Sequence, residues 1–218
     1  MNVELIGHYG SDEVIALSAW TSTSRDLSVE KRNRIPQLVR SLWLSGHETP
    51  FEKAQLHFLV DCDIASHIHL LKHRMSSLNA ESARYKELKD DKSYIPTDWI
   101  TEDQTLRQWA YRLQKTTDLN NKLYHKCLAE ITPIIGRKRA KESARFFKMY
   151  NTEITSDVMF NMRSFANFIK LRNSKHAQTE IRVIAQQMWD AVKNIPGDPF
   201  KSTLEVIEDK NMMSNVGI

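Results

Sequence analysis

The chain has 218 residues, of which 41% are hydrophobic and 27% charged, a composition typical of a globular protein with a substantial core. Its formal net charge of +4 weakly favours anionic partners such as nucleotides, phosphorylated cofactors or nucleic acid. No apolar stretch approaches the roughly 20 residues of a membrane span, and the first residues lack a secretory signal pattern. Because Cys62 and Cys127 are isolated, we expect no disulfide framework and a reducing, cytoplasmic setting.

The front of the chain contains both strand and helix signals. Ser11 is a suitable N-cap for a helix, and Gly46 is a natural helix stop. Periodicity predicts, in order, a strand over 2–8, a short helix over 11–24, a helix over 29–46, a strand over 55–62 and a helix over 63–74.

Helical patterns dominate the remainder. A long amphipathic helix is expected over 101–131, opened by a capping box of Thr101 and Gln104. Its expected buried stripe is Leu106, Trp109, Leu113, Leu123, Cys127 and Ile131. Further helices are expected over 156–172, 177–195 and 200–210. With few strands, all toward the front, the chain is predicted to form one α/β or α+β domain over 1–218, a small central sheet flanked by long helices.

The stretch 72–85, KHRMSSLNAESARY, concentrates bases and hydroxyl groups. The chain has neither G-x-G-x-x-G nor a Walker lysine loop, so any phosphate must be bound by side chains, a role that suits arginine. A helix would place His69, Lys72 and His73 on one face, followed by an irregular polar loop over 76–82. From composition alone, a phosphate site and an exposed helix–loop junction remain equally open.

Other chemistries are less favoured. A zinc site at His67, His69 and His73 lacks a fourth ligand, and positions 67 and 69 face different sides of a helix. The two cysteines fall at a strand end and on an apolar helix stripe, which indicates structural roles. The basic cluster near 137–141 has no interleaved aromatic residues, so a nucleic-acid-binding module is not expected.

A second dense stretch, 161–181, contains asparagines and arginines that interrupt a packed helix face. Asn amides can both donate and accept hydrogen bonds toward a flat heterocycle, although such residues are often merely solvated.

These stretches resemble motifs of the flavin-dependent thymidylate synthases. The family signature R-H-R-x-x-S-x-N-x-x-S-x-R-Y is present with Lys72 in place of the first Arg. HETPFEK at 47–53 resembles H-x-T-P-F-E-H, and KESAR at 141–145 resembles R-E-x-A-R. The stretch 161–181 resembles N-x-R-x-L-x-x-F-x-x-L-R followed by A-Q-x-E-I.

The resemblance implies an enzyme that reductively methylates dUMP to dTMP. Methylenetetrahydrofolate would donate the carbon and NADPH the electrons, by way of bound FAD, with no cysteine attacking the uracil. It also implies a homotetramer with active sites between subunits, and no nucleic-acid or membrane partner.

Site roles follow from the same resemblance. Arg172 is the expected catalytic residue, acting on the pyrimidine ring, where a fixed cation makes carbon 5 more nucleophilic. The expected FAD contacts are His47, Thr49, Lys72, His73, Arg74, Asn161, Arg163 and Asn167. The expected nucleotide contacts are His69, Ser77, Ser82, Arg84, Arg145 and Arg172.

The chain departs from the family pattern mainly on the nucleotide side. His69 stands where the family has a nucleotide-binding Gln, and Ala80 stands where most members have Glu. The family's L-P-x-N is K-M-Y-N here, with Lys148 and Met149. Two alternatives therefore remain beside dUMP methylation: the same chemistry on another pyrimidine nucleotide, by methylation or hydroxymethylation of dCMP, or a non-catalytic nucleotide-binding descendant.

Overall fold

The computed structural model describes the backbone of residues 1–24 and 26–216, and the side chains of 1–24 and 26–209. The chain divides into two compact units. Unit 1 comprises Met1, Asp61–Leu71 and Asn79–Ser156. Unit 2 comprises Asn2–Val60, Lys72–Leu78 and Asp157–Ile218.

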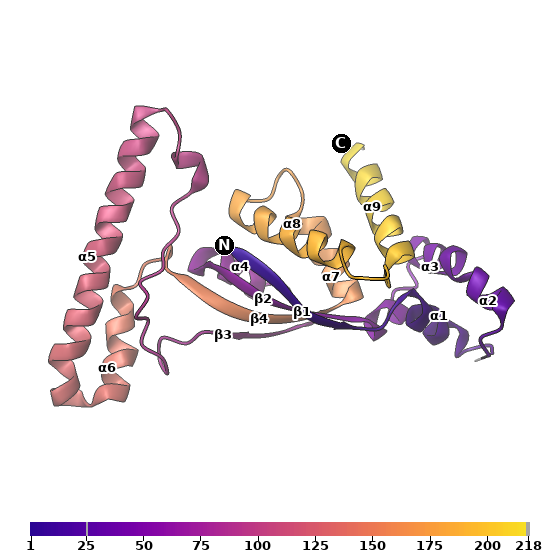
Figure 1. The fold of residues 1–218 in the computed structure, drawn as a ribbon, viewed down its shortest axis with the longest axis horizontal. Coiled ribbons are helices and arrows are strands. Elements are labelled where there is room, and N and C mark those ends of the chain that lie inside the picture. Colours follow the sequence, from indigo (N-terminus) through magenta and orange to yellow (C-terminus); the bar gives the residue numbers. More distant parts are fainter. Residues whose placement is uncertain (25, 217–218) are drawn as a thin grey trace. The chain divides into compact units, whose positions relative to one another are not determined.

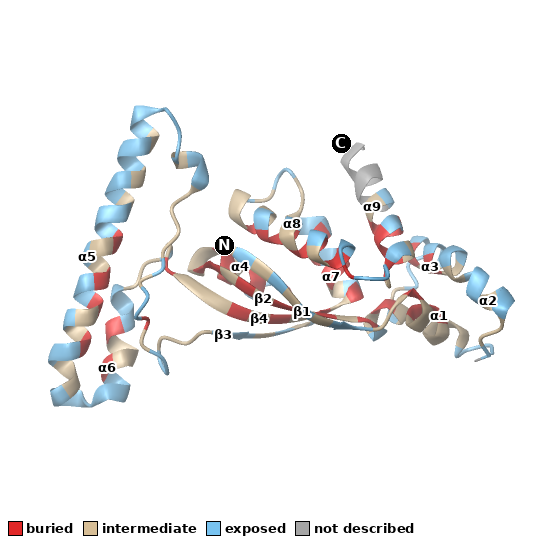
Figure 2. Ribbon diagram, viewed as in Figure 1, coloured by how far each residue is buried: buried red, intermediate tan, exposed pale blue. Residues whose placement is uncertain are grey.

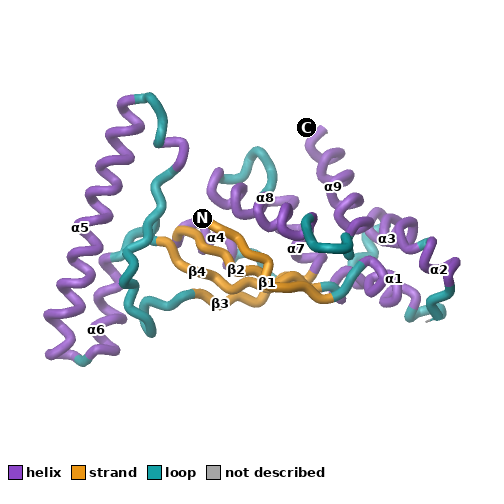
Figure 3. The backbone as a smooth tube through the Cα atoms, in the orientation of Figure 1, coloured by secondary structure: helices purple, strands orange, loops and turns teal. Residues whose placement is uncertain are grey.

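The described chain contains β-strands, α-helices and short 3-10 helices (Figures 1 and 3). The strands form one sheet in the order β1-β2-β4-β3: β1 (Asn2–Tyr9), β2 (Gln55–Asp63), β3 (Ser76–Ala80) and β4 (Glu153–Asn161). The α-helices are α1 (Asp12–Trp20), α2 (Val29–Asn33), α3 (Ile35–Leu44), α4 (Ile64–Leu71), α5 (Gln104–Ile135), α6 (Arg137–Ala144), α7 (Met162–Arg172), α8 (Thr179–Lys193) and α9 (Lys201–Val216). Short 3-10 helices are η1 (Thr49–Lys53), η2 (Thr97–Trp99) and η3 (Arg145–Phe147).

Unit 2 has an aromatic core between the strands and the helices α7 and α8. Phe58 of β2 stacks on Phe165 of α7 with ring centroids 5.8 Å apart, and Phe165 in turn stacks on Trp189 of α8 at 6.3 Å. Figure 2 shows the buried residues of α7 and α8 gathered on the side that meets the strands. This packing fixes the rotation of α7 and leaves its polar face, with Arg163 and Asn167, exposed.

Unit 1 is built around α5, whose 32 residues span about 48 Å. Its buried residues Tyr124 and Leu128 pack with Ala140 and Ala144 of α6 and with Leu88. Small residues on α6 allow the two helices to approach closely, so α5 and α6 form the core of this unit.

The predicted fold class, a small sheet flanked by long helices, is confirmed, but two strand assignments were wrong. Residues 76–80 form β3 rather than an irregular loop, because pairing in the sheet outweighs the weak strand propensity of Ser, Asn and Ala. Residues 153–161 form β4, so the strands are not all at the front of the chain. Ser156, Val158 and Phe160 are buried in alternation, a period-two pattern that the helical assignment overlooked.

Two helix details were also wrong. Asp103, not Thr101, caps α5: its Oδ1 accepts a hydrogen bond from the Leu106 N–H at 3.0 Å. The expected stripe is only partly the buried one: Trp109 and Leu123 are exposed, whereas Cys127 and Ile131 are partly buried against the core cluster. The buried residues of α5 are Thr117, Asn121, Tyr124 and Leu128. They fall along the half of the helix that α6 and η3 cover, whereas the apolar residues nearer the start of α5 have less to pack against.

Pro36 explains why the helix expected over 29–46 is divided. Proline in the first turn of α3 lacks an N–H and obstructs the preceding turn, so α2 ends at Asn33. The other front elements, including the Ser11 cap and the stop near Gly46, are confirmed. Within the described part of the chain, no helix is long and apolar enough to cross a membrane.

Candidate functional site

A cavity of about 370 Å³ in unit 2 brings several predicted cofactor residues together. It lies where α7, η1 and the segment after Lys72 meet. Its polar lining is Arg74, Arg163, Lys170, Asn167, Ser164, Glu48 and Glu52, and its apolar lining is Trp43, Met75, Ala166 and Ile207. Three bases and an amide in one cavity provide several hydrogen-bond donors, as an anionic ligand requires.

Two carboxylates hold Arg163 at the cavity. Its Nε donates to Glu48 Oε2 at 2.7 Å, and its Nη1 donates to Glu52 Oε1 at 2.6 Å. The hydrogen bond to Glu52, with that to Glu48, raises the pKa of Arg163, so the guanidinium stays charged. Its Nη2 amino group is not used by either carboxylate and can donate to a ligand.

The predicted catalytic residue contacts a residue of the signature stretch. Arg172 Nε, at the end of α7, donates to Nε2 of His73 at 2.8 Å. Arg has no acceptor, so Nε2 of His73 accepts this hydrogen bond. His73 is 8% exposed, and its ring meets Phe168 edge-on at 4.9 Å, which fixes the imidazole and hence the guanidinium.

The remaining predicted residues of unit 2 are less closely connected. Asn161 caps α7, with its Oδ1 accepting from the Ser164 N–H at 2.8 Å, so its amide N–H₂ is left for other contacts. His47, Thr49, Lys72 and Ser77 have exposed side chains and do not line the cavity.

Sequence reasoning missed several residues of the cavity, and one of them carries a recognisable signal. Lys170 lies three residues after Asn167 and seven after Arg163 on α7, a spacing that places all three on one helix face. Met75 has a backbone φ of 63° and an exposed side chain at the cavity, neither of which a motif reveals.

Unit 1 holds the predicted nucleotide residues Ser82, Arg84 and Arg145, together with His69. Arg84 Nε donates to Glu142 Oε1 at 2.6 Å, and this bond raises the pKa of Arg84 and lowers that of Glu142. Ser82 Oγ accepts from the Arg84 N–H at 3.3 Å, which forms a tight turn. Arg145 is exposed on η3.

The three histidines weighed for zinc lie in different settings. His67 is buried and shares a 2.8 Å hydrogen bond with Ser156 Oγ, and burial lowers its pKa. His73 accepts from Arg172 instead. Among the described residues, no three His, Cys, Asp or Glu side chains are grouped for a metal ion.

The lining of the cavity includes donors that can bind phosphate, beside the two carboxylates, Glu48 and Glu52, that hold Arg163. Arg74, Arg163 and Lys170 supply cationic donors, and Asn167 can both donate and accept. Trp43 and Met75 add apolar surface of the kind that a flat ring system contacts. The residues present therefore fit a phosphorylated, ring-bearing ligand.

Comparison with known proteins adds independent evidence. Residues 4–196 match the family model described as thymidylate synthase complementing protein. The chain is 30% identical over 214 residues to the flavin-dependent thymidylate synthase of Pseudothermotoga lettingae, covering 98% of this chain and 95% of the relative. It is also 30% identical over 204 residues to that of Thermosipho africanus, covering 88% of this chain and 85% of the relative.

Solved structures agree with the sequence relatives. The UMP/dUMP methylase PolB of Streptomyces cacaoi, bound with 5-Br dUMP, superposes with a TM-score of 0.82 at 26% identity over 95% of this chain and 94% of that one. The same protein bound with 5-Br UMP gives a TM-score of 0.76 at 25% identity, over 95% and 93% of the two chains. The chain therefore belongs to the thymidylate synthase complementing protein family and is an enzyme of the flavin-dependent thymidylate synthase type.

Proposed function

We propose that the chain catalyses the reductive methylation of dUMP to dTMP. Family membership implies FAD as cofactor, methylenetetrahydrofolate as one-carbon donor and NADPH as reductant. The methylene group and one hydride make the new methyl group, carbon 5 of the ring loses its proton, and tetrahydrofolate and NADP⁺ are the other products. The observation that carries the proposal is the hydrogen bond between Arg172 and His73, because it joins the predicted pyrimidine residue to a predicted flavin residue.

Arg172 would act on the pyrimidine through its terminal nitrogens. Its Nε is committed to His73, so the two Nη groups remain as a planar pair of donors for a ring carbonyl and the adjacent ring nitrogen. A fixed positive charge there favours loss of the ring proton and raises the electron density at carbon 5. His73 contributes by holding the guanidinium plane in one orientation.

Bound FAD supplies the relay of reducing equivalents between NADPH and the one-carbon unit. The cavity bases Arg74, Arg163 and Lys170 would hold its phosphates, and Asn167 would hydrogen-bond to its polar edge. The other residues assigned to the cofactor are His47, Thr49, Lys72, His73 and Asn161.

The nucleotide phosphate would be held by Ser82, Arg84 and Arg145, with Ser77 and His69 as further nucleotide contacts. Arg84 uses its Nε for Glu142, which leaves its terminal nitrogens available for phosphate oxygens. Its charge is secured by the same carboxylate, because the hydrogen bond to Glu142 raises the pKa of Arg84.

Cys62 is not suited to act as a nucleophile. This thiol is buried, and burial raises its pKa to about 12. The thiolate needed to attack a ring carbon is therefore nearly absent at neutral pH.

The base and the sugar of the substrate are the finer part of the proposal. The solved neighbour is described as a UMP/dUMP methylase, which makes UMP a second candidate beside dUMP. None of the relatives reported above favours dCMP, the alternative raised by His69 and Ala80. Ala80 has an exposed side chain on β3. Turnover of dUMP, UMP and dCMP measured side by side distinguishes the three substrates.

Assembly and location complete the proposal. We expect a homotetramer with active sites between subunits, and α5 supports an assembly because Trp109, Leu119 and Ile134 are exposed apolar residues along it. Sedimentation at micromolar concentration tests this, and a monomer would contradict it. Two free cysteines suit a reducing, cytoplasmic location.

One experiment tests the proposed reaction and its key residue. The purified protein is loaded with FAD, and NADPH oxidation and nucleotide product are followed with methylenetetrahydrofolate and dUMP, UMP or dCMP. In Arg172→Ala we expect flavin absorbance to survive and product formation to collapse. Arg40→Ala is the matched control, because Arg40 pairs with Asp209 at 2.7 Å and does not line the cavity. A protein that takes up no FAD would contradict the proposal.

A further inference from the structure

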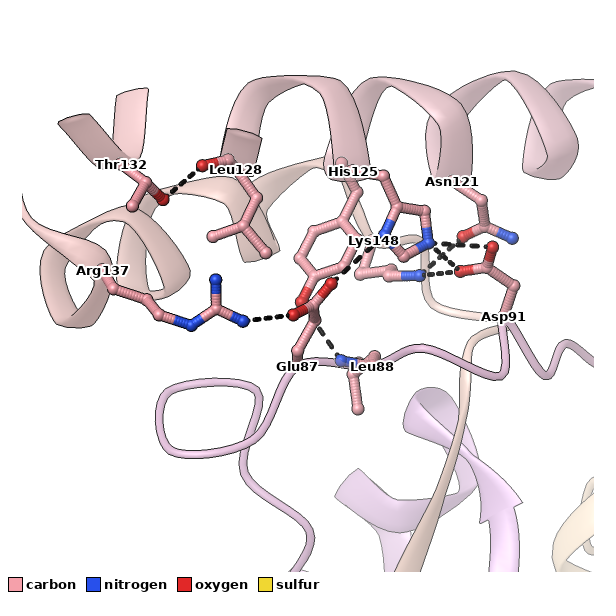
Figure 4. A network of polar contacts seen from close by, with 10 residues as sticks. Glu87, Leu88, Asp91, Asn121, His125, Leu128, Thr132, Arg137 and Lys148 are labelled. Atoms are coloured by element: carbon pink, nitrogen blue, oxygen red, sulfur yellow. Dashed lines mark hydrogen bonds and ion pairs between the residues drawn. The ribbon is translucent and has the colours of Figure 1, made fainter. Parts of the chain in front are cut away.

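Lys148 is a buried cation at a position where the family motif has an apolar residue. Its side chain is only 3% exposed. Nζ donates to Asp91 Oδ1 at 2.7 Å and to Asn121 Oδ1 at 2.8 Å, and it lies 4.4 Å from the centre of the Tyr124 ring (Figure 4). Burying an ammonium group is unfavourable unless it is paired and hydrogen-bonded, and here Asp91 and Asn121 supply the carboxylate and the amide oxygen that meet this requirement.

The partners of Lys148 extend into a polar network. Nε2 of His125 contacts both carboxylate oxygens of Asp91 at 3.0 Å. Burial opposes ionisation of Asp91, but the hydrogen bonds from Lys148 and His125 outweigh it and lower the pKa of this carboxyl group. Asp91 is therefore a carboxylate at neutral pH, held from two sides.

The network attaches one loop to the helical core of unit 1. Glu87 Oε2 accepts a hydrogen bond from Arg137 Nη2 at 2.7 Å, and the Leu88 N–H donates to Tyr124 Oη at 3.1 Å. With the bond from Lys148 to Asp91, the segment 87–91 is held at three points, at Glu87, Leu88 and Asp91, which Figure 4 labels.

This segment follows directly on the residues assigned to the nucleotide. Ser82 and Arg84 lie just before it, and Arg84 is itself held by Glu142. Lys141 Nζ, also on α6, donates to the backbone carbonyl of Tyr85 at 2.5 Å. Lys148 lies three residues after Arg145, so its bonds to Asp91 and Asn121 connect both backbone segments that carry the phosphate ligands.

We propose that Lys148 is a positioning residue for the nucleotide phosphate. Its ammonium joins the loop at Asp91 to α5 at Asn121, and thereby sets the backbone that carries Ser82, Arg84 and Arg145. Lys148 does not touch the nucleotide, and the cavity assigned to FAD in unit 2 does not include it. The inference rests on the proposed function, because it takes those three residues as phosphate ligands.

Replacement of Lys148 by methionine keeps much of the side-chain length and removes the charge. In the flavin-loaded full chain we expect KM for dUMP to rise about 10- to 100-fold, because the groups that bind the phosphate would be displaced from their positions. We expect kcat at saturating dUMP and bound flavin to change by less than about twofold, since an effect on binding alone leaves kcat unchanged. Lys148→Arg should recover part of the affinity, because it retains the cation.

The controls separate positioning from general stability. Lys126→Met removes an exposed lysine of α5 whose ion pair with Glu130 is 3.8 Å long, and it should leave KM unchanged. Asp91→Asn should raise KM in the same direction, and in a Lys148→Met background it should add little, because the two residues act through one contact.

Three results would overturn the inference. An unchanged KM with a lower melting temperature would mean that Lys148 only stabilises unit 1. A fall in kcat at unchanged KM would assign it to the chemical step. If Lys148→Met does not fold, Lys148→Arg and Asp91→Asn decide the matter by the same KM measurement. A wild-type protein that binds neither dUMP nor UMP would refute the proposed function itself, and the inference with it.

Discussion

Replacing His73 by leucine removes the acceptor of the 2.8 Å hydrogen bond from Arg172 Nε, while keeping a bulky side chain against Phe168. A hydrogen bond that involves a charged group contributes about 1.5 to 3 kcal/mol. If the transition state alone depends on this orientation, the loss corresponds to about 10- to 150-fold in rate. We therefore expect kcat per bound flavin to fall by about 10- to 100-fold.

The assay measures initial rates of dTMP formation over a range of dUMP concentrations, normalised to flavin absorbance. His73→Gln is the informative companion, because the Gln Oε1 can accept the same hydrogen bond, and it should recover most of the rate. Arg40→Ala serves as the folding and activity control. A leucine variant with the wild-type rate per flavin would refute the reasoning. Equal losses in the leucine and glutamine variants, confined to flavin content, would mean that His73 serves the cofactor alone.

Three further predictions concern the cavity, the fold and the thiols. Arg163→Ala should weaken FAD binding about 10- to 100-fold, measured by flavin titration, and an unchanged affinity would contradict its assignment. Burial raises the pKa of Asp12 above 3.8 despite hydrogen bonds from Thr203 and Ser202, so the folded state binds the proton of this carboxyl group more tightly than the unfolded state does. The unfolding free energy of the wild type should therefore fall relative to that of Asp12→Asn as the pH rises from about 4 toward neutrality. Parallel curves of unfolding free energy against pH for the two proteins would contradict this. The native protein should react with a thiol reagent at Cys127 only, because the Cys62 thiol is buried and its pKa is raised to about 12. For the same reason Cys62→Ala should stay active. Fast labelling of Cys62 would contradict this expectation.

The grouping of three predicted residues around the cavity of unit 2 could be anticipated from the sequence because these residues lie in local patterns. Arg163 and Asn167 are four residues apart on one helix, so a single amphipathic helix presents both to the same cavity. Arg74 belongs to the signature stretch, and it also lines that cavity. Lys170 lies on the same helix face and was not predicted, although its position is as open in the family motif as that of Asn167.

The network of Lys148 could not be predicted from the sequence. Its partners Asp91 and Asn121 lie 57 and 27 residues away, and nothing in the local pattern brings them together. Strand β3 was not predicted for a related reason. The segment Ser-Ser-Leu-Asn-Ala has little strand propensity, and it forms a strand because it pairs with β4, which lies far along the chain.

The burial of α5 illustrates a third limit. A helix presents an apolar stripe to whatever covers it, and the sequence does not say which half will be covered. Leu106 and Trp109 matched the expected period, yet Trp109 is 52% exposed. The buried face instead contains the polar residues Thr117 and Asn121, and Asn121 accepts a hydrogen bond from Lys148.

Mass spectrometry of the nucleotide tests the central claim most directly. The flavin-loaded protein is incubated with dUMP, methylenetetrahydrofolate and NADPH, and the nucleotide is then isolated and weighed. The account predicts a product heavier by one methylene group that coelutes with dTMP, and its absence when any one component is omitted. Recovery of unmodified dUMP from a protein that binds FAD and oxidises NADPH would contradict the account.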